Sequence, residues 1–219
     1  MLSAGLTEAE LAQLMCFDNW ERYEAARAKG RGVVVAVAHF GNWELMARAA
    51  VQRGMQLTAI TRALRGRLNE SILAARRRKG GMRELPEKGS TDAALRLLRR
   101  GETLGVIVDQ NMRPSRGIFV DFFGEPACTT PAAAVFALRT GASLMACFSL
   151  RGPDGTHRVT FEGPFAPPPG ARGQPAVRAL TQEVTRAVER AVRAHPDHWF
   201  WLHRRWKTRP PEALPPSAS

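Results

Sequence analysis

The stretch His39-Phe40-Gly41-Asn42-Trp43-Glu44 holds two side chains that together could carry out acid–base chemistry. An imidazole titrates near neutral pH, so His39 could take a proton from a hydroxyl nucleophile. The carboxylate of Glu44, five residues later, could hold the other ring N–H and favour the imidazolium. Gly41 would let a substrate approach the backbone N–H groups at the start of a helix, beside Asn42. We predict that His39 and Glu44 form a general base and that Gly41 and Asn42 contact the substrate.

A histidine and a glutamate at this spacing are weak evidence when taken alone. The same pair fits a histidine that satisfies a hydrogen bond at a strand end and a glutamate exposed on a helix. The surrounding sequence favours chemistry, because residues 33–38 form a continuous run of small and β-branched apolar side chains. Such a run is typical of a strand buried on both faces. His39 directly follows it, and ligands of open α/β sheets bind beyond the carboxyl ends of the strands.

The rest of the chain alternates apolar strands with helical patterns, which predicts an α/β fold with a mixed sheet flanked by helices. Capping-box spacings at Thr7/Glu10 and Asp18/Glu21 predict two short helices within residues 1–29. We expect further strands at 57–61, 104–108, 118–123, 143–150 and 157–161, and helices at 42–54, 68–78, 91–100, 131–138 and 177–193. Residues 1–209 are expected to form a single domain and residues 210–219 a disordered tail.

Two further groups of residues are candidates for binding a substrate. Asp109 and Gln110 follow the strand predicted at 104–108, so they either belong to a site at its end or cap a turn. Arg76 and Arg78 belong to a basic run after the first strand–helix–strand unit. Their guanidinium groups could bind phosphates or an acidic protein, or they could lie on a solvated helix face.

Composition narrows the classes of protein to which the chain could belong. The 219 residues include 32 Lys and Arg against 20 Asp and Glu, for a net charge of +12, with 44% hydrophobic and 24% charged residues. These are globular proportions. Three cysteines are too few for a disulfide framework or paired metal knuckles, and no apolar run approaches the roughly 20 residues of a membrane-spanning helix. The charge indicates a partner that is nucleic acid, an anionic membrane surface, or an acidic protein or substrate.

From Gly30 to Pro210 the chain resembles the bacterial lipid A biosynthesis acyltransferases, the late or secondary acyltransferases of lipopolysaccharide assembly. Four blocks of residues in the same order carry this resemblance. They are Gly30-Arg31-Gly32 with the valine strand and His39 to Glu44; Asp109-Gln110 with Phe119-Val120 and Phe122-Phe123-Gly124; Thr140-Gly141-Ala142; and the ending Trp199 to Pro210. The last block, with its alternating aromatic and basic residues, is the most specific.

The resemblance implies transfer of a fatty acyl chain from a thioester donor, usually acyl carrier protein, to a hydroxyl of a lipid A precursor, an anionic glycolipid. His39 would be the base, Glu44 would orient it, and the hydroxyl would attack the thioester directly, without an acyl-enzyme. The implied fold is that of the glycerolipid acyltransferases, with no metal and no cofactor. Family members usually begin with a membrane-anchoring helix that this sequence does not show. We therefore expect either a truncated start or peripheral binding at the cytoplasmic face of the inner membrane.

Three other functions stay open on the sequence alone. A related O-acyltransferase could use acyl-CoA as donor and another glycolipid or an aminolipid as acceptor. A catalytically idle lipid-binding protein would have the same fold without turnover. A basic nucleic-acid-binding domain would fit the charge, but no nucleic-acid motif occurs, so we expect no nucleic-acid partner.

Overall fold

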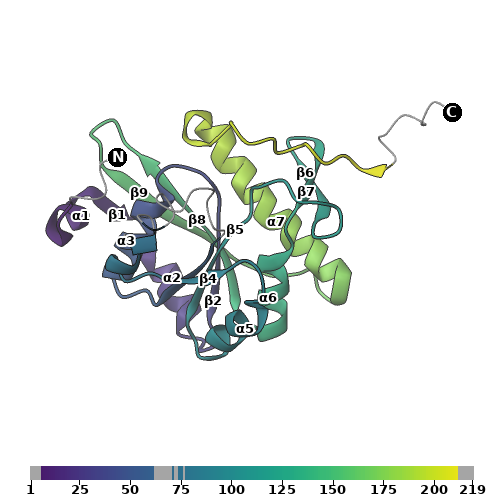
Figure 1. Cartoon of the computed structure of the whole chain (residues 1–219), viewed down its shortest axis with the longest axis horizontal. Helices are drawn as coiled ribbons and strands as arrows, with labels where there is room; N and C mark the ends of the chain where they lie inside the picture. Colours follow the sequence, from purple (N-terminus) through teal and green to yellow (C-terminus); the bar gives the residue numbers. More distant parts are fainter. Residues whose placement is uncertain (1–5, 62–70, 72–73, 76, 212–219) are drawn as a thin grey trace.

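The computed structural model describes residues 6–61, 71, 74–75 and 77–211. Seven strands form one mixed sheet in the order β1-β9-β8-β2-β5-β3-β4 (Figure 1). Their bounds are β1 Met15–Phe17, β2 Val33–Val37, β3 Leu57–Thr61, β4 Arg83–Pro86, β5 Thr103–Ile107, β8 Ser143–Arg151 and β9 His157–Phe165. The five strands from β8 to β4 are parallel, β9 is antiparallel to β8, and β1 is parallel to β9. The predicted α/β fold with a mixed sheet is confirmed.

Helices cover both faces of this sheet. One face carries α1 (Glu8–Leu14), α2 (Trp20–Arg27) and α3 (Trp43–Gln52), and the other carries α5 (Thr91–Arg99), α6 (Ala132–Thr140) and α7 (Gly173–Ala194). Side chains alternate along β2, so Val33 and Val35 pack in the first apolar layer and Val34 and Ala36 in the second. The central strand therefore has no solvent face, as its continuous apolar run predicts.

Two strands lie outside the main sheet. β6 (Ile118–Phe122) and β7 (Glu125–Thr129) form an antiparallel hairpin, of which only the first strand is predicted from the sequence. The side chain of Gln182 on α7 bonds both backbone groups of Asp121, accepting from its N–H at 2.8 Å and donating to its carbonyl at 2.9 Å. The hairpin is thereby fixed to the helical layer. A single 3-10 turn, η2 (Pro196–His198), follows α7.

The helix predictions differ from the structure mainly at helix starts. The capping box of Thr7 and Glu10 is confirmed. The one predicted for Asp18 and Glu21 is wrong, because α2 begins after Asn19 and the Asp18 carboxylate accepts instead from Arg158, at 2.9 Å. α7 begins four residues earlier than predicted, since a proline is tolerated in the first turn of a helix. No helix within the described ranges is both long enough and apolar enough to cross a bilayer.

Some predictions fall outside the described residues. They are Arg76, residues 68–70 and 72–73 of the helix predicted at 68–78, and residues 212–219 of the predicted tail. The described residues of the 68–78 stretch are helical.

The connections between strands determine where a ligand can bind. β2 leads through α3 to β3, on the far side of β5, whereas β5 leads through the hairpin and α6 to β8, on the far side of β2. The chain thus leaves two neighbouring parallel strands in opposite directions, and open α/β sheets bind ligands in the crevice at such a point. Val37 pairs with Ile107, so His39 and Asp109 lie at the same level beyond the two strand ends.

We predict that Gly41→Ala unfolds the turn between β2 and α3. Gly41 has a φ of +60°, and a Cβ at this position would lie 1.7 Å from the backbone oxygen of Ser149. The left-handed backbone costs about 1–2 kcal/mol in any L-residue, and the clash adds to it, so we expect a loss of about 4 kcal/mol or more in the free energy of unfolding. Urea denaturation followed by circular dichroism measures this loss.

The matched control is Gly30→Ala. Gly30 has a φ of +68° and nothing within 4 Å of its added Cβ, so the variant carries the backbone strain without the clash. Equal losses in the two variants would contradict the close approach to Ser149.

Candidate active site

The imidazole of His39 pairs with the carboxylate of Asp109. Nδ1 of His39 lies 2.8 Å from Oδ1 of Asp109, and the backbone N–H of His39 donates to Oδ2 at 2.7 Å. The indole N–H of Trp199 also donates to Oδ2, at 2.9 Å. The Asp109 side chain is 1% exposed and that of His39 is 14% exposed. An Nδ1–H that faces the carboxylate leaves Nε2 as the proton acceptor, and Nε2 has no hydrogen-bond partner among the described residues.

The surroundings of Asp109 keep its carboxyl group ionised. Burial raises the pKa of Asp109, but the hydrogen bonds and charge of His39, together with the hydrogen bond from Trp199, outweigh this effect and hold the pKa below its ordinary value. The result is a fixed negative charge against one nitrogen of the ring. Such a charge stabilises the imidazolium that forms when Nε2 takes a proton.

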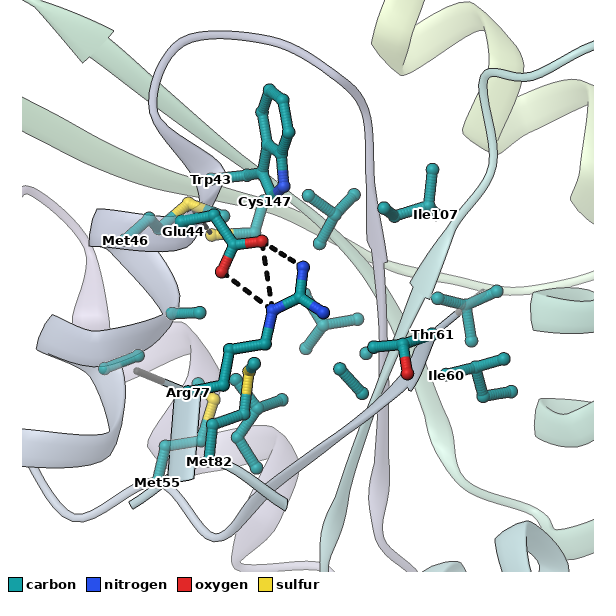
Figure 2. A pocket seen from close by; sticks show the side chains of 18 of the residues that line it. Trp43, Glu44, Met46, Met55, Ile60, Thr61, Arg77, Met82, Ile107 and Cys147 are labelled. Carbon is teal, nitrogen blue, oxygen red and sulfur yellow. Dashed lines mark hydrogen bonds and ion pairs between the residues drawn. The ribbon is translucent and has the colours of Figure 1, made fainter. Parts of the chain in front are cut away.

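A narrow apolar cavity lies between the sheet and α3 (Figure 2). Its lining comes from β2, β3, β5, β8 and α3 and from the loops before β3 and β4, and it includes Val37, Ile60, Gly105, Ile107, Met46, Met55, Met82 and Cys147. Trp43 closes the end next to the site, with its ring 4.8 Å from that of His39 between centroids. The volume open to a water-sized molecule is about 80 Å³, well below the ~300–1,000 Å³ of small-molecule pockets. Unbranched methionines line it, and such side chains adapt readily to a guest.

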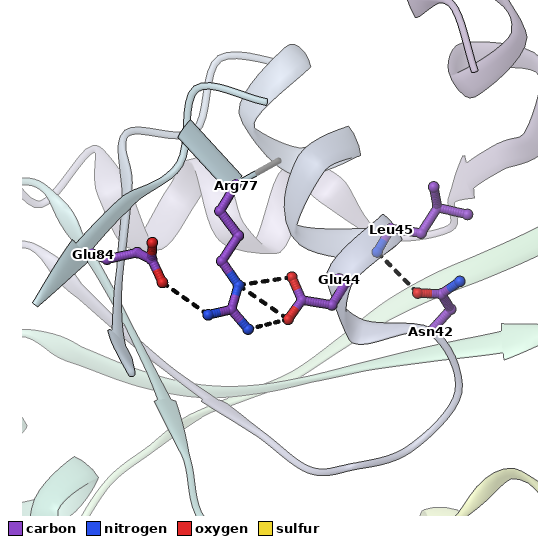
Figure 3. A network of polar contacts seen from close by, with 5 residues as sticks. All are labelled: Asn42, Glu44, Leu45, Arg77 and Glu84. Atoms are coloured by element: carbon purple, nitrogen blue, oxygen red, sulfur yellow. Dashed lines mark hydrogen bonds and ion pairs between the residues drawn. The ribbon is translucent and has the colours of Figure 1, made fainter. Parts of the chain in front are cut away.

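The sequence predicts that Glu44 contacts the imidazole of His39, but the structure shows no such contact between the two residues. Glu44 bonds Arg77 instead, with Nε of Arg77 3.1 Å and 3.0 Å from the two carboxylate oxygens and Nη2 in contact with Oε1 (Figure 3). Nη1 of Arg77 donates to Glu84 on β4, at 2.8 Å. Burial lowers the pKa of Arg77, but its two carboxylate partners outweigh burial and raise it. The reason for the error is that α3 starts at Trp43 and carries Glu44 over the cavity, while Asp109 occupies Nδ1 of the histidine.

Arg77 is the arginine of the basic run that the sequence prediction missed. Its side chain is 14% exposed, whereas Arg78 is exposed and lines a separate shallow depression beside β4 with Arg83 and Arg96. Consecutive helix residues point about 100° apart, so Arg77 and Arg78 face different ways. The apolar periodicity of this helix is the signal that could have selected it. A substrate contact of Arg78 stays a prediction.

The remaining predicted site residues mainly build the turn after β2. The N–H of Gly41 donates to the backbone oxygen of His198 at 2.8 Å, so it serves the fold. Asn42 caps α3, with its side-chain oxygen accepting from the N–H of Leu45 at 3.0 Å (Figure 3). Gln110 is exposed next to Asp109. Substrate contacts of Gly41, Asn42 and Gln110 stay predictions.

Residues 199–208, here called the closing segment, hold both members of the His39–Asp109 pair. The N–H of Phe200 donates to the backbone oxygen of His39 at 2.9 Å, and Trp199 forms a β-bridge with Phe40. Nε2 of His203 lies 3.0 Å from the backbone oxygen of Asp109. The sequence indicates this segment only as an aromatic and basic block, because nothing local shows which strand ends it contacts.

A buried arginine ties the closing segment to the hairpin. Arg205 is 1% exposed, and its guanidinium donates to the backbone oxygen of Cys128 at 3.1 Å and to the hydroxyl of Thr129. The group also lies over the ring of Phe122, 5.2 Å from its centroid. Burial lowers the pKa of Arg205 to about 10. The guanidinium of Arg205, although part of the basic block, therefore lies in the protein interior and is not on a surface that a substrate could contact.

Comparison with known proteins points to one family. Residues 4–208 match the family model described as bacterial lipid A biosynthesis acyltransferase. The chain is similar to the lipid A biosynthesis lauroyltransferase of Escherichia coli (strain K12), at 29% identity over 199 residues, which cover 89% of this chain and 62% of that protein. It is also similar to the phosphatidylinositol mannoside acyltransferase of Mycobacterium tuberculosis (strain ATCC 25618 / H37Rv), at 28% identity over 197 residues, covering 85% and 58%. The chain therefore spans 58–62% of the length of these two relatives.

We predict that Asp109→Asn lowers the free energy of unfolding at pH 7 by about 2–3 kcal/mol, since it weakens charge-assisted hydrogen bonds of a buried group. The pKa of Asp109 is lowered in the folded protein, so this stabilisation is present above the ordinary carboxyl pKa and is lost as the pH falls through the folded value. The advantage of the wild type over Asp109→Asn should therefore shrink below about pH 4. Urea denaturation at a series of pH values measures it.

Asp92→Asn serves as the control, because Asp92 is an exposed aspartate in the first turn of α5. We expect its effect to stay below about 1 kcal/mol at pH 7. A difference between Asp109→Asn and the wild type that does not change with pH would show that the carboxylate is not held as an anion.

Proposed function

The chain belongs to the bacterial lipid A biosynthesis acyltransferase family, and from this premise we propose that it transfers a fatty acyl chain from a thioester donor to a hydroxyl group of a glycolipid. The observation that carries the proposal is the His39–Asp109 pair, which lies at the switch point of the sheet with Nε2 free to accept a proton. The apolar cavity one side chain away supports the choice of a lipid substrate.

In the proposed reaction His39 acts as general base and then as general acid. Nε2 takes the proton of the acceptor hydroxyl as its oxygen attacks the thioester carbonyl carbon, and Asp109 stabilises the imidazolium that results. A carbon–oxygen bond forms, and the carbon–sulfur bond breaks as the tetrahedral intermediate collapses. The thiolate leaves with the electron pair and receives the proton from Nε2, so the products are an ester and a free thiol. No acyl-enzyme is formed.

Glu44 has a different role in this proposal from the one expected from the sequence. Its carboxylate holds Arg77 at the wall of the cavity, and Glu84 holds the same guanidinium from β4. We propose that Glu44 acts through Arg77, by keeping the cavity wall and the start of α3 in place, and not through the imidazole. Arg77 is then a positioning residue.

The proposed donor is acyl carrier protein and the proposed acceptor is a lipid A precursor at the cytoplasmic face of the inner membrane. Both are anionic, which fits the net charge of +12. The similarity to a phosphatidylinositol mannoside acyltransferase supports a second candidate acceptor, a phosphatidylinositol mannoside. Acyl-CoA with another glycolipid or an aminolipid is the further alternative.

We propose that the apolar cavity receives the donor acyl chain. An alkyl chain needs a long apolar lining, and the cavity extends from Trp43 beside the site to Met55 and Met82. Because its present volume is about 80 Å³, entry of a chain requires the methionine side chains to move. Gly105 on β5 lies in the wall, so its missing side chain leaves room there.

The first prediction from this function concerns the base. We expect His39→Ala and Asp109→Asn each to reduce acyl transfer by about 10²–10⁴-fold, the usual contribution of general acid–base catalysis. The measurement follows labelled acyl groups from acyl carrier protein to a lipid A precursor in detergent micelles, with phosphatidylinositol mannoside and acyl-CoA as second acceptor and donor. Circular dichroism verifies that each variant is folded.

The control for the base is His195→Ala, which removes an exposed histidine. Glu44→Gln tests the separate role of Glu44, and we expect a smaller loss than in His39→Ala, mainly in KM for the donor. Full activity of folded His39→Ala with any of these substrate pairs would overturn the mechanism.

The second prediction concerns chain length. A Cβ at Gly105 would lie 3.4 Å from Leu57 Cδ1 and 3.8 Å from Ala59 Cβ, so a small side chain fits there and takes up part of the cavity. We expect Gly105→Val to displace about two methylenes of the bound chain, at ~0.8 kcal/mol each, and so to lower transfer of the longest accepted acyl chain by about 10-fold relative to chains four carbons shorter.

Met55→Ala is the opposite change, because it enlarges the same cavity, and it should shift the preference toward longer chains. The ratio of long-chain to short-chain transfer is the readout, so a general loss of activity does not affect the result. An unchanged ratio in both variants would mean that the acyl chain binds elsewhere.

A further inference from the structure

Three consecutive large apolar side chains are exposed beside the candidate active site. Phe200, Trp201 and Leu202 are 46%, 52% and 86% exposed. Within the described ranges Leu138 is the one other large apolar residue of this kind, at 38%. Single exposed apolar residues are ordinary, but a contiguous group marks a surface that contacts a partner or a membrane.

The backbone under this triplet is held rigidly. The N–H of Phe200 donates to the backbone oxygen of His39 at 2.9 Å, and the oxygen of Phe200 lies 2.6 Å from Nδ1 of His203. The indole N–H of Trp201 donates to the backbone oxygen of Pro196 at 2.7 Å. These polar groups already have protein partners, so an apolar environment would not leave them without a hydrogen bond. The turn also needs little further ordering on binding.

Exposed basic residues follow the triplet in the chain and occur on the loop that is bonded to the same segment. Arg204 and Lys207 are exposed on the closing segment, and Arg113 is exposed on the loop after β5. Two hydrogen bonds of 3.0 Å between Asn111 and Thr208 tie that loop to the closing segment. Of the acidic residues nearby in the chain or paired with this segment, Asp197 is 77% exposed and lies 3.1 Å from His198, and Glu125 is paired with Arg209. The surface therefore combines an apolar tip with a cationic rim.

We propose that Phe200, Trp201 and Leu202 insert into the boundary between headgroups and acyl chains of an anionic bilayer. Aromatic and apolar side chains occupy that boundary, and basic side chains beside them meet the lipid phosphates. Arg204, Lys207 and Arg113 supply the basic contacts. An acidic protein would match the cations but would leave three large apolar side chains unexplained, so the bilayer accounts for both parts of the surface.

If the proposed function holds, insertion of the triplet also positions the base for catalysis. The ring of Phe200 lies 6.3 Å from that of His39 between centroids, and the two residues share a backbone hydrogen bond. Insertion of the triplet thus places the base at the level of the headgroups. A lipid hydroxyl can then reach Nε2 while its acyl chains stay in the bilayer.

The test is binding of the full chain to large unilamellar vesicles. Sedimentation with vesicles of phosphatidylcholine and phosphatidylglycerol in equal amounts is compared with vesicles of phosphatidylcholine alone. We expect the wild type to bind the mixed vesicles. Leu202→Ser should weaken this binding about 10-fold or more, because it removes a large apolar side chain without breaking a hydrogen bond of the fold. Leu138→Ser is the matched control and should bind like the wild type. Circular dichroism verifies the fold of both variants.

A second arm tests the cationic rim. Arg204→Glu with Lys207→Glu should abolish the preference for anionic vesicles. Lys29→Glu with Arg172→Glu, the same charge change at two exposed positions away from the triplet, serves as its control and should keep that preference.

Three outcomes would overturn the inference. The first is unchanged vesicle binding by folded Leu202→Ser. The second is a wild-type dimer that Leu202→Ser converts to a monomer without loss of vesicle binding, which would make the triplet a contact between two copies. The third is a folded Leu202→Ser variant that no longer binds acyl carrier protein but still binds vesicles like the wild type. Vesicle binding needs no turnover, so absence of acyl transfer with the expected binding would overturn the proposed function alone.

Discussion

A single buried anion organises the part of this protein where chemistry can occur. The carboxylate of Asp109 is almost fully withdrawn from water, so its charge has to be balanced by hydrogen bonds from the protein. Its donors come from the end of β2 and from the closing segment, at His39 and Trp199. Each donor is held in turn: His39 by the backbone of Phe200, and Trp199 by its bridge with Phe40. Satisfying one charge therefore fixes the strand ends, the turn after β2 and the closing segment relative to one another.

Much of the fold and of the location of the site could be predicted from the sequence. The continuous apolar run of β2 predicts a strand covered on both faces, and the alternation of elements predicts helices to cover it. Residues directly after such strands meet at one edge, which makes His39 and Asp109 candidates. The strands β1 and β4 are missed because three or four residues carry too little periodicity to be distinguished from loops, and β7 is missed because Pro126 within it argues against a strand.

The partners within the site could not be predicted, for a different reason. Which carboxylate meets His39 depends on which strand lies next to β2, and that neighbour is β5, 70 residues later in the chain. Spacing along the sequence favours Glu44, whereas the geometry of the sheet favours Asp109. The choice of Arg77 over Arg78 is set by the rotational phase of one helix. Local pattern predicts elements well, but contacts between elements need the tertiary arrangement.

The position of the closing segment near the end of the chain also affects the order in which the protein folds during synthesis. Domains fold as the chain leaves the ribosome, with amino-terminal parts first. Strands β2, β5 and β8 can pair before residue 199 has been synthesised, since all of them precede α7. Until then Asp109 lacks the hydrogen bond from the indole of Trp199, and the backbone oxygen of His39 lacks the hydrogen bond from Phe200. The His39–Asp109 pair is thus completed last, so a chain whose synthesis stops early has a sheet without the donors that hold this pair.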